Sequence, residues 1–499
     1  MASSLKTAST GTPGSEKTFL GHPMGLAFLF MTEMWERYSF YGMRALLVLY
    51  LATNVADGGF GMKDATAVAI YSVYNAMVYL LALPGGWLGD RVWGARKAVA
   101  VAGVVIMAGH FLLAVPAQAS FFIGLALIAA GSGVLKANIS TMVGHLYPDK
   151  NDPRRDGGFT IFYMGINLGA FVAPLTIGWV GQQVNWHLGF AMAGVGMALG
   201  LLFFLIGSRH LSEKSSEVPA PLSPVERSTV IRKALVWLGV AGAAYAVIGL
   251  AGLFTINWAL WPLTVLGLVL PAWYLFRIKR DKELTPIEQG RMSGYVWFFV
   301  AAAIFWGIYD QTGSTLSLFA KNSTESTLFG FDFPESWFQS LNPLFVMALA
   351  PLFAMLWVAL FKRNKEPSTL SKFAAALVLI GGSFGVMMIA QGMASGDTKV
   401  SPMWLVSVYF IQTVGELCLS PVGLSLTTKL APVKYSSQMM GVWFLAVTAG
   451  DSVIALLQLI GAPTDSQAWF ASQGVLAALA GVAIFMYRKK VKALMGGVN

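Results

Sequence analysis

Apolar runs of about 20 residues recur along the whole of this 499-residue chain, and they constrain its fold more than any other feature. A helix that crosses the hydrocarbon core of a bilayer needs roughly 20 apolar residues. Only 12% of the residues are charged, about half the share usual in soluble domains. The pattern predicts an all-α polytopic membrane protein with 14 spans, at residues 24–53, 65–90, 97–115, 120–146, 157–181, 187–207, 230–252, 255–277, 288–320, 336–361, 371–393, 402–429, 435–460 and 466–487.

The basic residues predict how these spans are oriented. Of the 34 Lys and Arg residues, 28 fall at the ends and in the loops on the side of the N-terminus. Three lie in the opposite loops (Lys63, Lys321, Lys399) and three within spans (Arg37, Arg44, Lys136). The positive-inside rule then places both termini in the cytoplasm. The net charge of +10 therefore comes from basic loops on one side of the membrane and does not indicate a nucleic-acid partner.

A break in composition divides the chain into two groups of six spans. Residues 208–229, SRHLSEKSSEVPAPLSPVERST, are rich in Pro, Ser and charge and are interpreted as a cytoplasmic linker. We therefore expect a tail at 1–23, a six-helix bundle at 24–207, an inserted two-helix hairpin at 230–279, a second six-helix bundle at 280–488 and a tail at 489–499. The N-terminal segment lacks the layout of a cleaved signal peptide, so we expect the first span to direct insertion.

The first span carries four charges in the stretch EMWERYSFYGMR. Because successive residues of a helix turn by about 100°, Glu33, Glu36, Arg37 and Arg44 share one face. One charge at the bilayer centre costs about 2.5–3.5 kcal/mol on insertion scales, so this face must look into a wet or paired interior. A structural role remains open, in which the glutamates only neutralise Arg37. The functional interpretation is that Glu33 and Glu36 bind a transported proton while the arginines bind a carboxylate.

The fourth span adds a lysine within GSGVLKANIS. Lys136 lies about ten residues from the predicted cytoplasmic end, or roughly 15 Å along the helix. That depth disfavours a snorkelling side chain and favours a functional charge.

Polar residues in other spans are candidates to complete the site. In span five, Tyr163 and Asn167 lie one turn apart in FYMGINLGAFVAP, and Pro174 predicts a kink. Either polar residue could instead only bridge helices. The loop GGWLGDRVWGARK after span two could lock two helices together or be a plain tight turn.

The second half supplies acids. Asp310 shares a helix face with Trp306 in FWGIYDQTG and needs a basic partner, for which Arg44 and Lys136 are available. Glu416 shares a face with Ser420 in QTVGELCLSPVG, where Pro421 predicts a break. Asn342 precedes a proline, and Trp443 and Asp451 lie in span thirteen; for Asp451, structural and functional roles stay equally open. Even without Asp451, the acids outnumber the bases by four to three, and a buried carboxylate without a partner tends to hold a proton.

These motifs resemble those of a known family. GGWLGDRVWGARK is similar to the signature between helices two and three of the major facilitator superfamily. EMWERYSFYG resembles the E-x-x-E-R-F-x-Y-Y-G motif of the proton-coupled oligopeptide transporters, FYMGINLGA their F-Y-x-x-I-N-x-G motif, and GELCLSPVG their helix-ten motif. Bacterial members carry two extra helices between the bundles, as the span count here predicts.

The resemblance implies a site between the two bundles. Arg37, Arg44 and Lys136 would bind the peptide carboxylate, Glu416 and Asn342 its amino terminus, and Asn167 its backbone. Side-chain pockets would be lined by Tyr41, Tyr79, Tyr163, Trp306, Ser420 and Trp443. Proton coupling and gating would involve Glu33, Glu36, Arg37, Lys136, Asp310 and Glu416, with Asp310 facing Arg44 at the outer gate.

Two positions depart from the family motif. Tyr38 stands where the motif has Phe, and Phe40 where it has the first Tyr. Phe40 has no hydroxyl, so a hydrogen bond from that position is not available. Span two contains no histidine, although some relatives use one as a proton site, so the proton would fall to carboxylates.

The leading hypothesis is a proton-coupled symporter that imports di- and tripeptides through a bacterial plasma membrane, with peptides, protons and membrane lipid as partners. Peptides are zwitterions, which suits bases at one end of a site and an acid at the other. A transporter of nitrate or another anion remains an alternative, although Glu416 disfavours it. A membrane-embedded enzyme is not supported by any nucleophile–base pair or cofactor motif. We expect no cofactor and no metal, and the single cysteine, Cys418, allows no internal disulfide.

Overall fold

The computed structural model describes residues 18–147, 149, 152–328, 330–394 and 398–496. Most of the predicted tail at 1–23 and the end of the tail at 489–499 lie outside these residues. The described part of the chain is all-α apart from two short antiparallel pairs and one isolated parallel bridge. The pairs are β1 (Thr18–Phe19) with β2 (His22–Pro23) and β3 (Thr327–Leu328) with β4 (Phe331–Asp332), and the bridge joins Thr324 to Val400.

The N-terminal bundle contains the first six predicted spans. Its helices are α1 (Gly25–Ala52), α2 (Asp64–Leu80), α3 (Ala82–Leu88), α4 (Ala95–Leu113), α5 (Gln118–His145), α6 (Arg155–Ala173), α7 (Trp179–Gln183) and α8 (Trp186–Gly207). Within the bundle α1 packs on α6 and α8, and α4 on α5.

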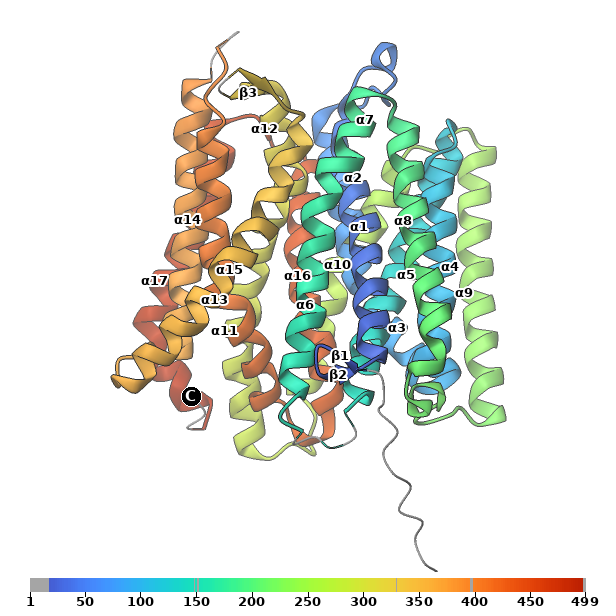
Figure 1. The fold of residues 1–499 in the computed structure, drawn as a ribbon, viewed down its shortest axis with the longest axis vertical. Coiled ribbons are helices and arrows are strands. Elements are labelled where there is room, and N and C mark those ends of the chain that lie inside the picture. Colours follow the sequence, from blue (N-terminus) through green and yellow to red (C-terminus); the bar gives the residue numbers. More distant parts are fainter. Residues whose placement is uncertain (1–17, 148, 150–151, 329, 395–397, 497–499) are drawn as a thin grey trace, which may run out of the picture.

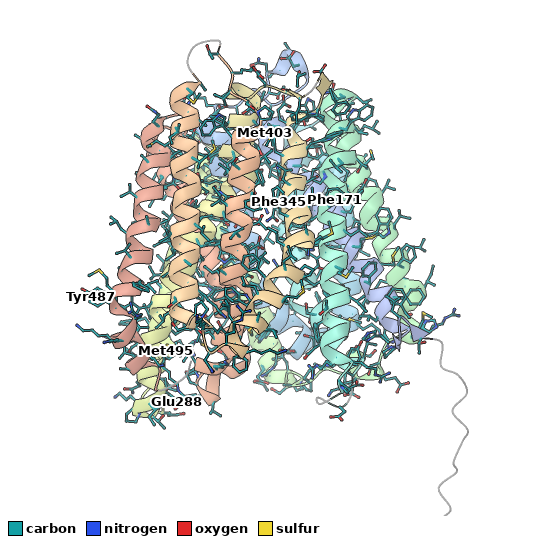
Figure 2. All side chains as sticks on the ribbon, turned by 60° about the vertical axis from the view of Figure 1, so that its left-hand side comes forward. Phe171, Glu288, Phe345, Met403, Tyr487 and Met495 are labelled. Atoms are coloured by element: carbon teal, nitrogen blue, oxygen red, sulfur yellow. The ribbon has the colours of Figure 1, made fainter. Side chains whose placement is uncertain are left out.

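The C-terminal bundle contains the last six spans. Its helices are α11 (Pro286–Tyr309), α12 (Thr315–Ser323), α13 (Leu341–Lys362), α14 (Thr369–Met393), α15 (Met403–Leu430), α16 (Ser436–Leu459) and α17 (Gln467–Leu494). Helix α14 packs on α17 and α15, and the two bundles meet where α2 contacts α16 and α6 contacts α13. Figure 2 shows Phe171 of α6 and Phe345 of α13 at similar height along this second junction.

Thirteen helical segments of the described chain are long and apolar enough to cross a membrane. Helix α1, with 28 residues, is also long enough to cross a membrane, but four charged residues make it less apolar than the others: Glu33, Glu36, Arg37 and Arg44. Together they give the predicted 14 spans. The first described residues and the end of α17 lie at the same end of the molecule (Figure 1). We call this end the terminal side and the opposite end the far side.

The inserted hairpin consists of α9 (Pro224–Leu250) and α10 (Asn257–Lys279). Helix α10 packs against α16 and α2, at the junction of the bundles. Helix α9 has no buried residue and stands at the edge of the molecule (Figure 1). The helix begins at Pro224, six residues before the predicted start of the hairpin. The reason is a capping box that the sequence contains as SPVE: the Ser223 hydroxyl accepts from the Glu226 amide, and the Glu226 carboxylate accepts from the Ser223 amide.

Three prolines affect their helices in three different ways. At Pro174 the helix continues through a π-helical turn, Pro174–Gly178, into α7, because proline lacks the amide that the helix would use there. Pro343 stands in the first turn of α13, where a missing amide costs nothing. The predicted break at Pro421 is wrong, because α15 is continuous from Met403 to Leu430.

The loop after span two is a close helix contact as well as a turn. It forms a π-helical turn, Gly89–Trp93, and Asn138 of α5 donates to the carbonyl of Gly85 at 3.0 Å. The linker packs on this turn, because the amides of Ala220 and Leu222 donate to the carbonyls of Asp90 and Arg91 at 3.0 and 3.2 Å. The linker therefore ties α9 to the N-terminal bundle.

A second contact on the terminal side joins two loops. Asp281, between α10 and α11, accepts hydrogen bonds at 2.6 Å from the Lys434 ammonium and from the Tyr435 hydroxyl, between α15 and α16. The hydrogen bonds from Lys434 and Tyr435 hold the pKa of Asp281 well below its usual range.

Candidate functional site

The charged face of α1 is buried inside the N-terminal bundle. Glu33, Glu36 and Arg37 are between 0% and 4% exposed. Arg37 Nε lies 3.0 Å from Glu33 Oε1 and 2.5 Å from Glu36 Oε2. The Phe40 ring covers the guanidinium, with its centroid 5.3 Å from Arg37 Cζ. One arginine thus serves two carboxylates, so the triad carries one more acid than base.

Lys136 of α5 approaches this triad from the next layer. Its ammonium lies 3.8 Å from the centroid of the Tyr79 ring and 5.5 Å from that of Phe444, which belongs to α16 of the other bundle. No acid of the described chain lies within ion-pair distance of it. Two aromatic faces stabilise the cation and leave its charge unmatched at the junction of the bundles.

Glu416 of α15 is the acid of the C-terminal bundle that would complement Lys136 of the N-terminal bundle. Its Oε2 accepts from the Tyr309 hydroxyl at 2.8 Å and from the Asn342 amide at 2.9 Å. Within the described residues Glu416 forms no ion pair. Two neutral donors of its own bundle therefore hold this carboxylate in place, and none of the described residues supplies a cation to it.

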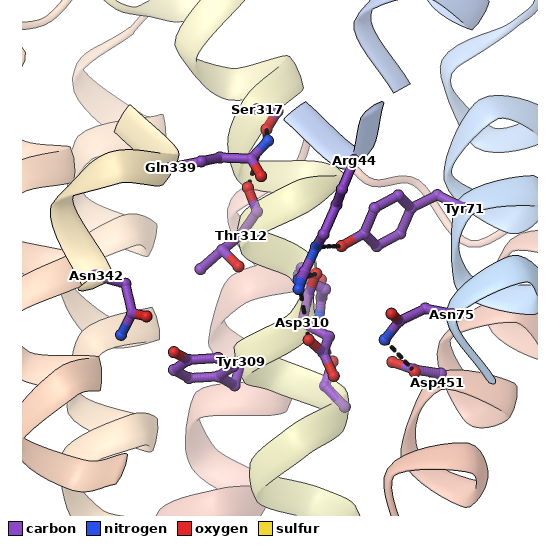
Figure 3. Close-up of polar contacts among 12 residues, drawn as sticks. Arg44, Tyr71, Asn75, Tyr309, Asp310, Thr312, Ser317, Gln339, Asn342 and Asp451 are labelled. Atoms are coloured by element: carbon purple, nitrogen blue, oxygen red, sulfur yellow. Dashed lines mark hydrogen bonds and ion pairs between the residues drawn. The ribbon is translucent and has the colours of Figure 1, made fainter. Parts of the chain in front are cut away.

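The predicted pairing of Arg44 with Asp310 is present. Arg44 Nη2 donates to Asp310 Oδ1 at 2.9 Å, and Arg44 Nε donates to the Tyr71 hydroxyl (Figure 3). Asp310 can reach across because α11 ends at Tyr309 and the chain passes through a 3₁₀ turn, Asp310–Gly313, before α12. Gly313 lies directly against the Tyr71 phenol, so that a Cβ there would overlap the hydroxyl.

Other hydrogen bonds close the same far side. Lys321 of α12 donates to the Thr53 hydroxyl at 2.8 Å, the Ser336 amide to Gln182 at 3.1 Å, and the Ser340 hydroxyl to the carbonyl of Phe171 at 2.8 Å. Each of these joins the N-terminal bundle to the C-terminal one. The structure therefore has its far side closed.

The predicted lining residues on α1, α6 and α15 differ in their contacts and in their exposure. Tyr41 lies against the Arg44 guanidinium, and Tyr163, which is 47% exposed, accepts through its carbonyl from Asn167. Ser420 is partly exposed one turn from Glu416.

Two tryptophans differ in their surroundings. Trp306 packs edge-on against Tyr309, and its buried indole N–H has no hydrogen-bond partner among the described atoms. Trp443 is only 3% exposed, because its ring packs on Gly423 of α15 and near Phe373 of α14. In this conformation Trp443 is part of the bundle core, and its expected place in a side-chain pocket stays a prediction.

The structure also identifies residues that sequence reasoning missed. Tyr309 orients Glu416, and Tyr71 and Asn75 of α2 contact the far-side ion pair and its neighbour Asp451. Tyr309 stood next to Asp310 in a motif already singled out. Tyr71 and Asn75 are two of several polar residues in the second span, beside Thr66, Ser72, Tyr74 and Tyr79, so no pattern in the sequence singles them out.

The departures from the motif also have a structural explanation. The Tyr38 hydroxyl lies 2.9 Å from Thr176 Oγ1, on the side of α1 that faces α6, away from the charged face. Phe40 uses its ring face on Arg37. The described part of the chain contains no group of three or more His, Cys, Asp or Glu side chains that could hold a metal.

Two six-helix bundles with charges at their junction and one closed side define a multi-pass membrane transporter. The comparisons agree: residues 96–468 match the model of the POT family. The chain belongs to that family.

Several relatives match this chain over most of their own length. The chain is 40% identical to a di-/tripeptide transporter of Lactococcus lactis, over 97% of this chain and 99% of the relative, and 39% identical to a peptide transporter of Yersinia enterocolitica, over 90% of each. Among solved structures, it is similar to a peptide transporter POT in complex with sulfate, with a TM-score of 0.92 and 43% identity over 96% of this chain and 97% of that one. A mutant of a peptide transporter POT in complex with alafosfalin gives a TM-score of 0.88 at 43% identity, with the same coverage.

Proposed function

We propose that this protein is a proton-coupled symporter that imports di- and tripeptides by alternating access across a bacterial plasma membrane, with its terminal side in the cytoplasm. One observation carries the proposal: an unmatched base, Lys136, and an unmatched acid, Glu416, lie on the two bundles where these meet. A free peptide presents the opposite pair of charges, a carboxylate at one end and an ammonium at the other. The relatives named for di- and tripeptides support the same substrate class.

In this proposal, Lys136 and Arg37 bind the peptide carboxylate, while Glu416 binds the amino terminus. Arg44 is occupied by Asp310 and Tyr71 while the far side is closed, so it would bind substrate only after that contact opens. Asn342 and Tyr309 hold Glu416 in place, and Asn167 would contact the peptide backbone. Tyr41, Tyr79, Tyr163, Trp306 and Ser420 would line the side-chain pockets.

Proton coupling would use the triad of α1. Arg37 is the one base that forms an ion pair with Glu33 and Glu36 among the described residues, and Lys136 acts on them from beyond ion-pair distance. The second carboxylate is therefore costly in a buried site. A proton on either glutamate removes that charge and weakens the hold on Arg37, which becomes available for the peptide carboxylate. Proton binding and peptide binding then favour each other.

Asp310 has a separate role in this scheme. Its ion pair with Arg44 closes the far side and would break when the protein opens outward. The alternating cycle then exposes the same peptide site first to the outside and then to the cytoplasm.

Uptake into proteoliposomes tests the proposal. An imposed gradient, acidic outside, should drive accumulation of labelled dialanine that is recovered intact. Nitrate should not accumulate under the same gradient. Accumulation of nitrate without peptide would favour the anion transporter, and recovery of free alanine would favour an enzyme.

A further inference from the structure

A second hydrogen bond joins the bundles beside the Arg44–Asp310 ion pair. Asn75 Nδ2 of α2 donates to Asp451 Oδ2 of α16 at 2.7 Å (Figure 3). Asp451 is 2% exposed and Asn75 is 1% exposed. The contact is therefore shielded from bulk solvent, and it joins the two bundles beside the far-side ion pair.

The charges at this contact do not balance. Among the described residues, the charged groups that act on Asp451 are Asp310, which follows α11, and Arg44 of α1. Arg44 already forms its ion pair with Asp310. Helix α2 adds the neutral Tyr71 and Asn75, and α10 meets α16 through Gly267 against Ser452. Lys136 also acts on Asp310 but forms no ion pair with either acid in the described chain. Arg44, bound to Asp310, is therefore the one cation that either of these two carboxyl groups contacts.

An uncompensated carboxylate in a buried membrane site is unstable relative to the neutral acid. The hydrogen bond from Asn75 is made by an uncharged amide and supplies no positive charge. One bound proton would bring the sum of the charges of Arg44, Asp310 and Asp451 to zero. Asp451 is the group that lacks a cation of its own.

We propose that Asp451 is a second proton-binding site, which takes up one proton each time the bundles close on the far side. This site on α16 is distinct from Glu33 and Glu36, which lie on α1 and form ion pairs with Arg37. The proposal rests on the alternating-access part of the proposed function and not on the identity of the substrate.

The sign of the pH effect follows from linkage. When the far side opens, water reaches Asp451 and stabilises its carboxylate, so the open state binds fewer protons than the closed state. Acidity must then favour closure, by up to about tenfold in the closed-to-open ratio for each pH unit when one proton is taken up. Removal of the acid group should remove this dependence.

Paired spin labels can measure closure without any substrate. In the full chain, Cys418→Ser removes the native thiol, and Lys63→Cys with Glu325→Cys places one label on each bundle at exposed far-side positions. Dipolar electron paramagnetic resonance from pH 5 to pH 8 then reports the closed fraction in lipid nanodiscs.

The expected result is a closed fraction that rises as the pH falls. Asp451→Asn, which resembles the protonated acid, should stay closed across the range, with the pH response lost. Asp451→Glu should keep a response, and Asp57→Asn, an exposed far-side acid, should behave like the parent. An unchanged pH response in Asp451→Asn would overturn the proposal, as would a pH-independent parent.

If Asp451→Asn does not fold, Asp451→Glu and the parent decide the question, because a flat response in either contradicts a titrating acid at this position. The result also separates this proposal from the transport function. A flat response together with pH-driven peptide uptake rejects Asp451 alone. A normal response without peptide uptake rejects the proposed substrate or coupling and leaves Asp451 standing.

Discussion

Arg44 Nη2 lies 2.9 Å from Asp310 Oδ1, and this ion pair joins the two bundles on the far side, whereas Glu416 and Lys136 form no ion pair within the described part of the chain. The far side is thus closed by an ion pair, and the junction below it carries one base and one acid on opposite bundles.

Glu416→Gln should weaken the transport of dipeptides with a free amino group by about 10–100-fold, because a hydrogen bond to a charged group contributes roughly 1.5–3 kcal/mol. Amino-blocked peptides should be affected much less. Competition by free and N-acetylated dialanine in counterflow measures the difference. An equal loss for both would show that Glu416 does not bind the amino terminus.

Lys136→Ala should abolish proton-driven uptake, because the site loses its unpaired base. Lys63→Ala, which removes an exposed lysine in a far-side loop, is the matched control and should transport normally. Both variants need normal amounts of folded protein by size-exclusion chromatography. Wild-type uptake rates in Lys136→Ala would remove this residue from the site.

Gly313→Ala should prevent the far side from closing tightly, because the added Cβ overlaps the Tyr71 phenol that accepts from Arg44. Uptake should fall at least tenfold. Gly385→Ala, whose Cβ would meet open space on α14, is the control and should be neutral. Normal uptake in Gly313→Ala would mean that the contact can shift without functional cost.

The loop contact between Asp281 and Lys434 should persist in mild acid. The folded-state pKa of Asp281 lies below the unfolded value, so its contribution to stability is present above the unfolded pKa and is lost only as the pH falls through the lower folded value. The thermal midpoints of the parent and Asp281→Asn should thus differ by a constant amount between pH 8 and pH 5. A difference that disappears near pH 6 would contradict the low pKa.

Glu33→Gln and Glu36→Gln should each abolish concentrative uptake and leave peptide counterflow. In the parent, peptide affinity should rise as the pH falls, since proton and peptide binding are linked. In the glutamine variants, which resemble the protonated state, this pH dependence should flatten. Peptide accumulation by the double variant would move the coupling site elsewhere, with Asp310 the next candidate.

The sequence predicted the spans well, because length and hydropathy decide insertion and the structure keeps all 14. It also predicted the face that Glu33, Glu36 and Arg37 share, which depends only on helix periodicity. It missed Tyr309 and Asn75, because periodicity does not say which faces of different helices meet across two bundles. Trp443 packs over Gly423 in this conformation, and its place in a side-chain pocket stays a prediction.

Boundary errors had local causes. The capping box at Ser223 starts α9 inside the predicted linker, and α11 ends at Tyr309, where the 3₁₀ turn Asp310–Gly313 begins within the predicted span. Both depend on hydrogen bonds that form only within one or two turns. A hydropathy pattern averaged over 20 residues does not detect such local bonds.

The most direct test of proton-coupled peptide transport measures both solutes at once. Proteoliposomes with a trapped pH indicator, equal pH on both sides and no membrane potential receive dialanine outside. The account predicts that the interior acidifies as peptide enters, and that the acidification is lost in Glu33→Gln/Glu36→Gln while peptide still exchanges. Peptide entry at a normal rate with no change of internal pH in the parent protein would contradict the account.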